Sequence, residues 1–374
     1  MFITKEHLPE IEVAIQEIEA LLEVEDDASF DDAIIFQQYD ITTFSAKLDV
    51  NGLVNRLNNK DILIPPFHRN YVWKLEDASR FIESLLLGLP IPGIFLAREL
   101  NSGKLLVIDG QQRLKTLQFF YAGYFNPQDD TEPQTFSLSR VHRQFEGKTY
   151  QMLKGINKRK LDTSIIPATI VKQDFPQEDD SSLYYIFERL NSGGKRLTPQ
   201  EIRSILYHGS LIDLIKKLNQ WPSWRNLFGK PSVSLKDEEL ILRFLAFYFD
   251  AEEYEHPLKE FLNQFASQNR QPTDEFLLKA ERAFTNAIDA IWQNLGENAF
   301  KPKKAFNTAM FDSIMVGLAR AMEKQMIDYS QIKPAYEALL NDDTYMDAIS
   351  RSTSEESSVK TRLSKAIEKF REIG

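Results

Sequence analysis

The sequence contains no cysteine among its 374 residues. This absence excludes disulfide bonds, thiolate catalysis and cysteine-ligated zinc or iron–sulfur sites. Long apolar runs are absent too, since none reaches the roughly 20 residues that a membrane-spanning helix needs. The start, Met1–Glu6, is not typical of a signal peptide. We therefore expect a soluble, cytoplasmic protein.

Positive charge is also in short supply. The chain has 45 Lys and Arg against 55 Asp and Glu, a net charge of −10. Because a protein that coats DNA through general electrostatics needs clustered cations, this balance argues against that class. The deficit is local, since residues 5–32 hold eleven acidic residues against the single Lys5, and the rest of the chain is about neutral.

The same acidic segment carries an apolar stripe at helical spacing, formed by Leu8, Ile11, Ile15, Ile18 and Leu22. A helix this short is marginal by itself, so we expect the stripe to pack on the body of the protein or on a second copy. Two interpretations stay open. The segment covers a basic nucleic-acid surface until it is displaced, or it is a solubilising surface helix or dimer contact.

The most informative motif follows an apolar run at residues 105–108. The run leads into Asp109, Gly110, Gln111, Gln112 and Arg113, and then into a helical pattern. A helix N-terminus leaves four N–H groups unpaired and carries a partial positive charge, so it favours an anion. Gly110 permits close approach of a phosphate, Arg113 offers a bidentate fork, and Asp109 can hold hydrated Mg²⁺ or orient a water. The alternative is a plain Asp-Gly turn with Arg113 in a surface ion pair.

Two further blocks carry polar residues in constrained loops. Residues 64–73 place His68, Arg69 and Tyr71 after a Pro-Pro pair, which forces an extended entry. Residues 187–203 contain a glycine-rich loop with Asn191 and Lys195, followed by the capping box Thr198-x-x-Glu201. Arg69 is a candidate second phosphate contact, and the glycine-rich loop can close over a triphosphate. This loop is not a Walker A motif, and taken by itself it is more typical of a helix–helix turn.

Taken in this order, the three blocks resemble the family of the N-terminal domain of GmrSD restriction endonucleases, also called DUF262. The resemblance covers about residues 33–215, and residues 109–113 are its specific part. It implies a ParB/sulfiredoxin-like fold in which the Gly-x-x-Arg element, Gly110 to Arg113, faces a nucleotide phosphate. It also implies a prokaryotic defence protein that binds and hydrolyses nucleoside triphosphates while acting on modified or foreign DNA.

The chain departs from the family pattern in two respects. Where the family usually has Gln, this chain has His68. The imidazole either alters nucleotide choice and adds a titratable group, or simply replaces one donor with another. Many family members also continue into an HNH nuclease domain, which needs at least two histidines around a metal. The last of the five histidines here is His256, so we expect no HNH nuclease in this chain.

A basic segment spans residues 140–160 and contains a single acidic residue, Glu146. Phe145 and Tyr150 are interleaved with its cations, a combination suited to stacking beside contacts with a nucleic-acid backbone. A flexible, well-solvated insertion would have a similar composition. The seven candidate nucleic-acid-binding residues are Arg140, Arg143, Lys148, Lys154, Lys158, Arg159 and Lys160.

Hydrophobic periodicity predicts an α+β fold, with strands and helices mixed in the first part of the chain and mainly helices beyond it. The resemblance implies that the mixed part is a ParB/sulfiredoxin-like core. The predicted domains are an acidic helix at 1–32, a nucleotide-binding core at 33–215 and a helical domain at 216–374. Within the core we expect a helix at 75–87, a hairpin of strands 94–97 and 105–108, a strand at 165–171 and a connector at 173–180. The later helices are expected at 240–248, 275–295, 309–322, 332–340 and 359–370.

These observations predict a Mg²⁺-dependent nucleoside triphosphatase of an antiphage or restriction-type system, acting with DNA. Asp109 and Arg113 are the expected catalytic residues, with Asp109 also the metal ligand. The expected nucleotide-binding residues are Gly110, Gln111, Gln112, His68, Arg69, Tyr71, Asn191 and Lys195. Two alternatives remain: a non-catalytic DNA-binding adaptor that recruits a separate nuclease, and a metal-dependent nickase that uses carboxylates of the core. A defence-system partner and a homo-oligomer are compatible with each.

Overall fold

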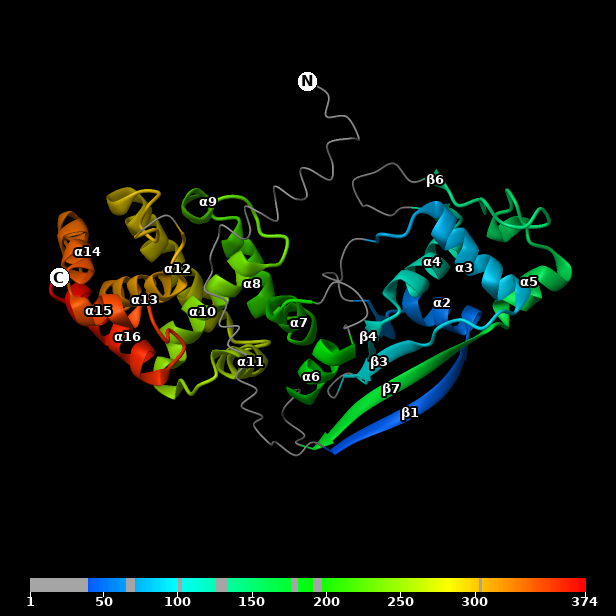
Figure 1. The fold of residues 1–374 in the computed structure, drawn as a ribbon, viewed down its shortest axis with the longest axis horizontal. Helices are drawn as coiled ribbons and strands as arrows, with labels where there is room; N and C mark the ends of the chain where they lie inside the picture. The colour runs from blue at the N-terminus through cyan, green and yellow to red at the C-terminus, as the bar shows by residue number, and fades with distance from the viewer. Residues whose placement is uncertain are drawn as a thin grey trace, which may run out of the picture. The chain divides into compact units, whose positions relative to one another are not determined.

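The structure, a computed structural model, describes residues 40–64, 71–99, 103–125, 134–175, 181–190, 197–302 and 305–374. The predicted acidic helix at 1–32 lies outside these ranges. The described chain forms two compact units, the first ending at Leu206 and the second running from Tyr207 to Gly374. Figure 1 shows strands in the first unit and helices alone in the second, so the α+β class and the order of a mixed core before a helical domain are confirmed.

The first unit is built on a mixed five-stranded sheet with the order β1-β7-β3-β4-β2. Its outer pair is antiparallel and long, joining β1 (Asp40–Asp49) to β7 (Ile165–Phe175). Strand β3 (Ile94–Arg98) runs parallel to β7 and antiparallel to β4 (Leu105–Asp109). Strand β2 (Ile62–Leu63) closes the far edge. Strand β4 lies between β3 and β2, and the chain leaves the sheet at the end of β4, at Asp109.

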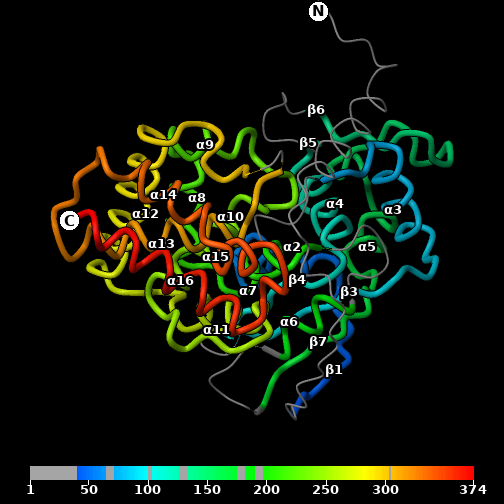
Figure 2. Tube along the Cα trace, turned by 60° about the vertical axis from the view of Figure 1, so that its left-hand side comes forward, coloured from blue at the N-terminus to red at the C-terminus, as the bar shows by residue number. Residues whose placement is uncertain are grey.

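Four helices cover one side of this sheet, as both ribbon and tube views show (Figures 1 and 2). They are α2 (Val50–Asn58), α3 (Leu75–Leu87), α4 (Gln111–Ala122) and α5 (Gly155–Asp162). Their apolar faces and the inner face of the sheet form one core, with Leu53, Ile82, Leu96, Val107 and Leu117 essentially inaccessible to solvent. Burial of such side chains is the main force that holds a small domain together.

Shorter elements complete the first unit. Strands β5 (Tyr124–Phe125) and β6 (Gln134–Thr135) pair separately, and a 3₁₀ turn spans Tyr150–Met152. Helices α6 (Ser181–Leu190) and α7 (Pro199–Leu206) follow the sheet. The predicted capping box of α7 is present, because the Thr198 N–H donates to the Glu201 carboxylate and the Glu201 N–H donates to the Thr198 hydroxyl.

The predicted hairpin of β3 and β4 and the helix at 75–87 are confirmed, and Gly88 ends that helix in the left-handed conformation. The connector predicted from Gln173 is wrong at its start, because β7 continues to Phe175. Pairing with β1 along the full length of β7 overrides the polar sequence of that end. Strand β1 was not predicted, since both of its faces are largely exposed and it lacks an apolar alternation.

The second unit consists of helices packed around a central, almost fully buried helix, α13 (Thr308–Lys324). Its main neighbours are α10 (Lys236–Asp250), α12 (Asp274–Leu295) and α16 (Glu356–Arg371). The others are α8 (Ser210–Asn219), α9 (Pro222–Phe228), α11 (Leu258–Gln268), α14 (Ile332–Leu340) and α15 (Asp343–Ala348). Each of the five helices predicted here is present.

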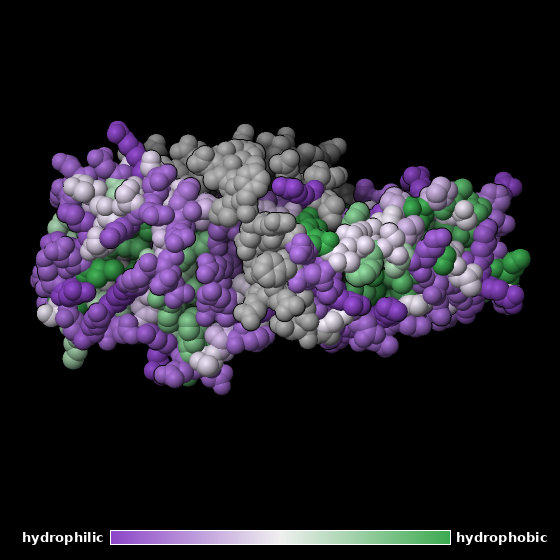
Figure 3. Space-filling model, turned by 90° about the horizontal axis from the view of Figure 1, so that it is seen from below, coloured by the Kyte–Doolittle hydropathy of each residue, from purple (hydrophilic) through white to green (hydrophobic). Residues whose placement is uncertain are grey.

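The surface is mainly hydrophilic, as expected for a chain in which 27% of the residues are charged. The face in Figure 3 is mainly hydrophilic, with separate hydrophobic patches on each unit. Across the described ranges, no helix combines the length and the apolar character that crossing a membrane requires.

Candidate functional site

The turn from β4 into α4 places the predicted motif at an open helix N-terminus. Gly110 is the N-cap, with a φ of 101° that L side chains rarely adopt, and as a glycine it offers no side chain to cap the first turn of α4. A Cβ at this position would collide with the side chain of Ile94 on β3, so only glycine fits between the two strands and the helix. Glycine at this position brings the first turn of α4 close against β3, and the predicted phosphate site at this helix start stays a prediction.

Arg113 extends along this turn. Its Nη2 lies 2.7 Å from Oδ2 of Asp109, one helical turn earlier, and its side chain is only 14% exposed whereas that of Asp109 is 47% exposed. The Nε atom of Arg113 is buried and has no hydrogen-bond partner among the described residues. A mostly buried guanidinium with an unpaired Nε donor at the start of a helix is suited to binding an anion.

The Gln112 side chain connects this turn to the segment at residues 72 and 73. Its side-chain oxygen accepts hydrogen bonds from the backbone N–H groups of Val72, at 3.1 Å, and Trp73, at 3.4 Å. The end of the block that carries His68 and Arg69 is therefore fastened to the first turn of α4. Gln111, its neighbour, is buried, whereas Gln112 is half-buried.

Tyr71 is held in the core beside this turn. It is 4% exposed, its ring packs edge-on against Phe119 and Phe125, and its hydroxyl lies 2.6 Å from that of Thr116. Burial raises the pKa of the Tyr71 hydroxyl well above its usual range. In this position Tyr71 anchors the start of the described segment from residue 71 onward against α4, and its role as a nucleotide ligand stays a prediction.

Thr116 was missed by the sequence analysis. Its hydroxyl donates to the backbone oxygen of Gln112 and faces Tyr71. The sequence did contain one signal for Thr116. It is four residues after Gln112, and residues four apart lie on the same side of a helix.

Four predicted ligands lie outside the described residues: His68, Arg69, Asn191 and Lys195. The structure does bring Asp109, Gly110 and Arg113 together at one turn. Within the described ranges, no group of three or more His, Asp or Glu could hold a metal ion by itself. The metal-binding role of Asp109 therefore stays a prediction.

The basic segment, residues 140–160, lies in the same unit beside α3 and runs into α5. Arg140 faces Glu76 at 3.7 Å near the start of α3, and the Lys160 side chain lies next to Gly88 at its end. The remaining cations, Arg143, Lys148, Lys154, Lys158 and Arg159, form no ion pair with any residue the structure describes, and neither does Lys160. Their charges are therefore available to a polyanion.

The aromatic residues of this segment do not offer the stacking surface that was predicted. Phe145 is 1% exposed and belongs to the core, so that part of the prediction is wrong. The Tyr150 ring stacks on Tyr121 at 4.0 Å, carries the Lys158 ammonium over its face and donates its hydroxyl to Asp162. Burial and the neighbouring carboxylate raise the pKa of Tyr150 to about 12, so this hydroxyl is a structural donor.

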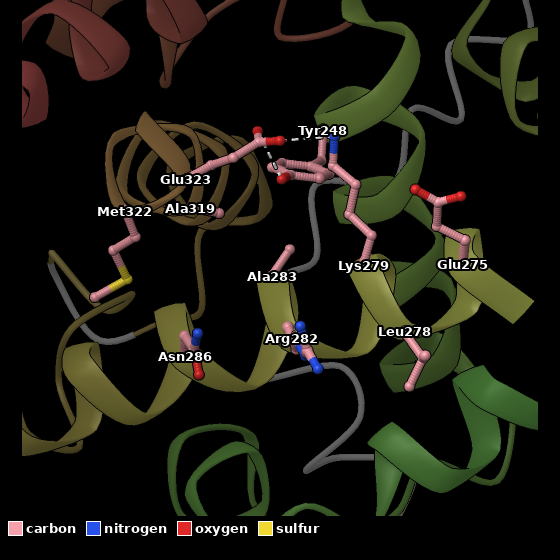
Figure 4. A pocket seen from close by; sticks show the side chains of 10 residues that line it. All are labelled: Tyr248, Glu275, Leu278, Lys279, Arg282, Ala283, Asn286, Ala319, Met322 and Glu323. Atoms are coloured by element: carbon pink, nitrogen blue, oxygen red, sulfur yellow. Dashed lines mark hydrogen bonds and ion pairs between the residues drawn. The ribbon is translucent and has the colours of Figure 1, made fainter. Parts of the chain in front are cut away.

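A separate groove of about 500 Å³ opens on the second unit between α10, α12 and α13 (Figure 4). The Lys279 ammonium spans its edge, 2.7 Å from the Glu323 carboxylate, which also accepts a hydrogen bond from Tyr248. These charges satisfy one another, so the groove lacks the unpaired buried donor that marks the β4–α4 turn. Its lining residues are Tyr248, Glu275, Leu278, Lys279, Arg282, Ala283, Asn286, Ala319, Met322 and Glu323.

The part of the chain that contains the β4–α4 turn is similar to a known protein family. Residues 50–208 match the family model of the GmrSD restriction endonuclease, N-terminal domain, which confirms the resemblance in the sequence. A relative in Methanocaldococcus jannaschii, an uncharacterized protein, is 32% identical over 113 residues that cover 23% of this chain. The matched part spans 19% of that relative's length.

Proposed function

Because residues 50–208 match the family model of the GmrSD restriction endonuclease, N-terminal domain, we propose that the chain is a nucleoside triphosphatase of a restriction-type defence system and acts together with DNA. The chemistry is assigned to the β4–α4 turn. The observation that carries this assignment is Arg113, a mostly buried guanidinium with an unpaired Nε donor at a helix start whose N-cap is glycine.

The proposed reaction is hydrolysis of the terminal phosphoanhydride bond. Water attacks the γ-phosphorus, the bond to the β–γ bridging oxygen breaks, and the products are the diphosphate and inorganic phosphate. Charge that develops on the phosphoryl oxygens is neutralised by Arg113 and by the N–H groups of the first turn of α4. Asp109 holds Arg113 in place through Oδ2, and its Oδ1 has no hydrogen-bond partner in the described part of the chain.

Asp109 is also the expected contact for Mg²⁺. This ion typically takes one or two protein carboxylates and completes its shell with phosphate oxygens and water. A single half-exposed carboxylate at the phosphate site fits that pattern. When bound, Mg²⁺ would neutralise part of the triphosphate charge.

Residues from the other two sequence blocks are proposed to complete the nucleotide shell. Arg69 lies two residues before Tyr71, which is anchored against α4 through Thr116. Asn191 and Lys195 directly follow α6, which contacts β4. His68 is the position most open to choosing among bases, because imidazole and amide differ in shape and charge.

The test is phosphate release from each of the four ribonucleoside triphosphates with Mg²⁺, comparing wild type with Arg113→Ala. We expect turnover to fall by about 10²–10³-fold, the effect of removing a donor that stabilises transition-state charge. Arg80→Ala on the exposed face of α3 is the matched control, since it removes the same charge elsewhere in the unit.

Nucleotide binding by calorimetry separates chemistry from affinity. Full turnover in Arg113→Ala would contradict the assignment of this turn. No turnover in the wild type, with binding that depends on Arg113, would instead favour a nucleotide sensor.

A second candidate function is a non-catalytic DNA-binding adaptor that recruits a nuclease. The unpaired cations of the basic segment favour it. Salt-sensitive DNA binding without nucleotide turnover would support the adaptor. Metal-dependent nicking of plasmid DNA by the pure protein would support the third candidate, a nickase.

A further inference from the structure

Two large apolar side chains project from the basic segment into solvent. Met152 at the end of the 3₁₀ turn is 57% exposed, and Ile156 in the first turn of α5 is 80% exposed. Figure 3 shows hydrophobic atoms standing out among hydrophilic ones at the end of the first unit where α5 lies in Figure 1. We call Met152 and Ile156 the apolar tip.

The apolar tip is held by buried residues on both sides. Leu153, between its two members, is 2% exposed, and Leu161 at the far end of α5 is inaccessible. Just before the tip, Tyr150 is fixed by its stack on Tyr121 and its bond to Asp162. Hydrophobic side chains this exposed gain nothing from folding, whereas a firmly packed base presents them in a defined position.

The charged side chains next to the apolar tip are cations that form no ion pair with any residue the structure describes. Lys154 lies between its two members, and Lys158 and Arg159 follow one turn later on α5. The two carboxylates of this stretch are otherwise engaged. Glu146 accepts from the backbone N–H groups of residues 140 and 141, and Asp162 accepts from two tyrosine hydroxyls. Neither pairs with a cation of the tip in the described structure.

The cations also extend over a useful length. From Arg140 beside Glu76 to Lys160 beside Gly88 they follow α3, whose 13 residues span about 20 Å at 1.5 Å per residue. That distance corresponds to roughly six base pairs along duplex DNA. The segment therefore presents apolar points within a cationic strip of the size of a DNA contact.

We propose that the apolar tip is a wedge that enters between base pairs of duplex DNA while the flanking cations bind the phosphates. This inference rests on the proposed action with DNA and adds its mode. Proteins that kink DNA insert Met, Ile, Leu or Phe into a base step, and the bent duplex then wraps more of the basic surface. The tip offers two such side chains, with Lys154, Lys158 and Arg159 beside them.

The experiment compares the full chain with Met152→Ser/Ile156→Ser, which removes apolar atoms and no charge. Binding of a 20-base-pair duplex is followed by fluorescence anisotropy at several KCl concentrations. Bending is followed by energy transfer between dyes at the duplex ends, and unstacking by 2-aminopurine fluorescence. Met326→Ser is the matched control, since Met326 is 94% exposed on the second unit.

The wedge predicts that the double variant loses bending and the 2-aminopurine signal and binds about tenfold more weakly or worse, because two apolar side chains are no longer buried. Its slope of log affinity against log salt stays unchanged. Lys154→Ala/Arg159→Ala has the opposite signature, a slope reduced by about two, because two phosphate contacts are lost.

Three results would overturn the wedge. The first is bending and unstacking by the double variant equal to wild type, and the second is a wild type that does not bind duplex DNA at low salt. The third is apolar-tip-dependent binding to phosphatidylserine vesicles with unchanged DNA bending, which would identify a membrane contact. Nucleotide turnover in the absence of DNA tests the triphosphatase separately, so failure of one proposal is distinguishable from failure of the other.

Discussion

At Gly110 the absence of a side chain is what allows strand β4 to turn into helix α4. Its φ of 101° is unfavourable for any other residue, and Ile94 occupies the space that a Cβ would need. Gly123, at the other end of α4, has a similar φ of 85° but open space around it. A substitution at Gly123 therefore introduces backbone strain alone, whereas one at Gly110 introduces both backbone strain and a steric collision.

We predict that Gly110→Ala destabilises the first unit by about 2–3 kcal/mol, because strain and overpacking add, and that it weakens nucleotide binding. Gly123→Ala, with strain alone, should cost about 1 kcal/mol and leave the nucleotide site unaffected. Urea denaturation gives both free energies of unfolding. Equal losses for the two variants would mean that the Ile94 side chain moves aside for the added methyl group at no cost.

Glu238 is the residue of the second unit with the most perturbed carboxyl group. It is 7% exposed, and its Oε2 has no hydrogen-bond partner among the residues described. Burial, with a further contribution from the charge of neighbouring Asp237, raises the pKa of Glu238 to about 7. The folded protein thus holds this proton more tightly than the unfolded chain does.

Stability should therefore fall as pH rises from about 4.5, the pKa of an unfolded glutamate, to about 7, and be independent of this group above that range. The loss amounts to about 3 kcal/mol, at 1.4 kcal/mol for each pH unit. In Glu238→Gln this contribution should vanish, so the difference between wild type and variant changes across that window. Glu275→Gln, on an exposed position of α12, serves as the control. An unchanged pH profile would assign the pH dependence to other groups.

Among the helices, α10, α13 and α16 are joined by a buried ionic cluster. Asp312 on α13 lies 2.7 Å from Arg243 on α10 and 3.4 Å from Arg362 on α16, and both Asp312 and Arg362 are inaccessible to solvent. Burial lowers the pKa of Arg362, although Asp312 opposes that shift. The Asp312 carboxylate thus pairs with buried guanidinium groups from two other helices.

We predict that Asp312→Asn lowers the free energy of unfolding by about 3–5 kcal/mol, because it removes the negative charge that pairs with both buried guanidinium groups. By comparison, Lys217→Ala breaks a largely exposed pair with Glu281 and should cost less than about 1 kcal/mol. Chemical denaturation monitored by circular dichroism measures both. If Asp312→Asn cost no more than Lys217→Ala, water or a bound anion would have to reach the cluster.

On the scale of the whole molecule, each unit has its own hydrophobic core. The sheet and α2–α4 enclose the first, and α13 lies at the centre of the second. Units with separate cores unfold as separate cooperative transitions unless their interface dominates. Calorimetry should therefore resolve two transitions, of which Gly110→Ala lowers one and Asp312→Asn the other. A single transition shifted by both variants would indicate that the units unfold together.

The sequence was most informative about the ends of helices, because the residues that begin or end a helix lie close to it in the chain. The helix at 75–87 ends at Gly88, and the Thr198–Glu201 capping box starts α7, both as predicted. Strand β1 and the end of β7 were not predicted, because each is stabilised by its partner across the sheet. Pairing between segments more than a hundred residues apart leaves no local pattern in the chain.

The sequence by itself determined the residue types at the β4–α4 turn, because strand, glycine and helix pattern are encoded within residues 105–120. Only the tertiary structure decided how each side chain is used. It buried Tyr71 against Thr116, fastened the segment after the Pro-Pro loop through Gln112, left the Arg113 Nε unpaired and exposed the apolar tip. Burial depends on which distant segments pack together, and that information lies in the whole chain and in no single motif.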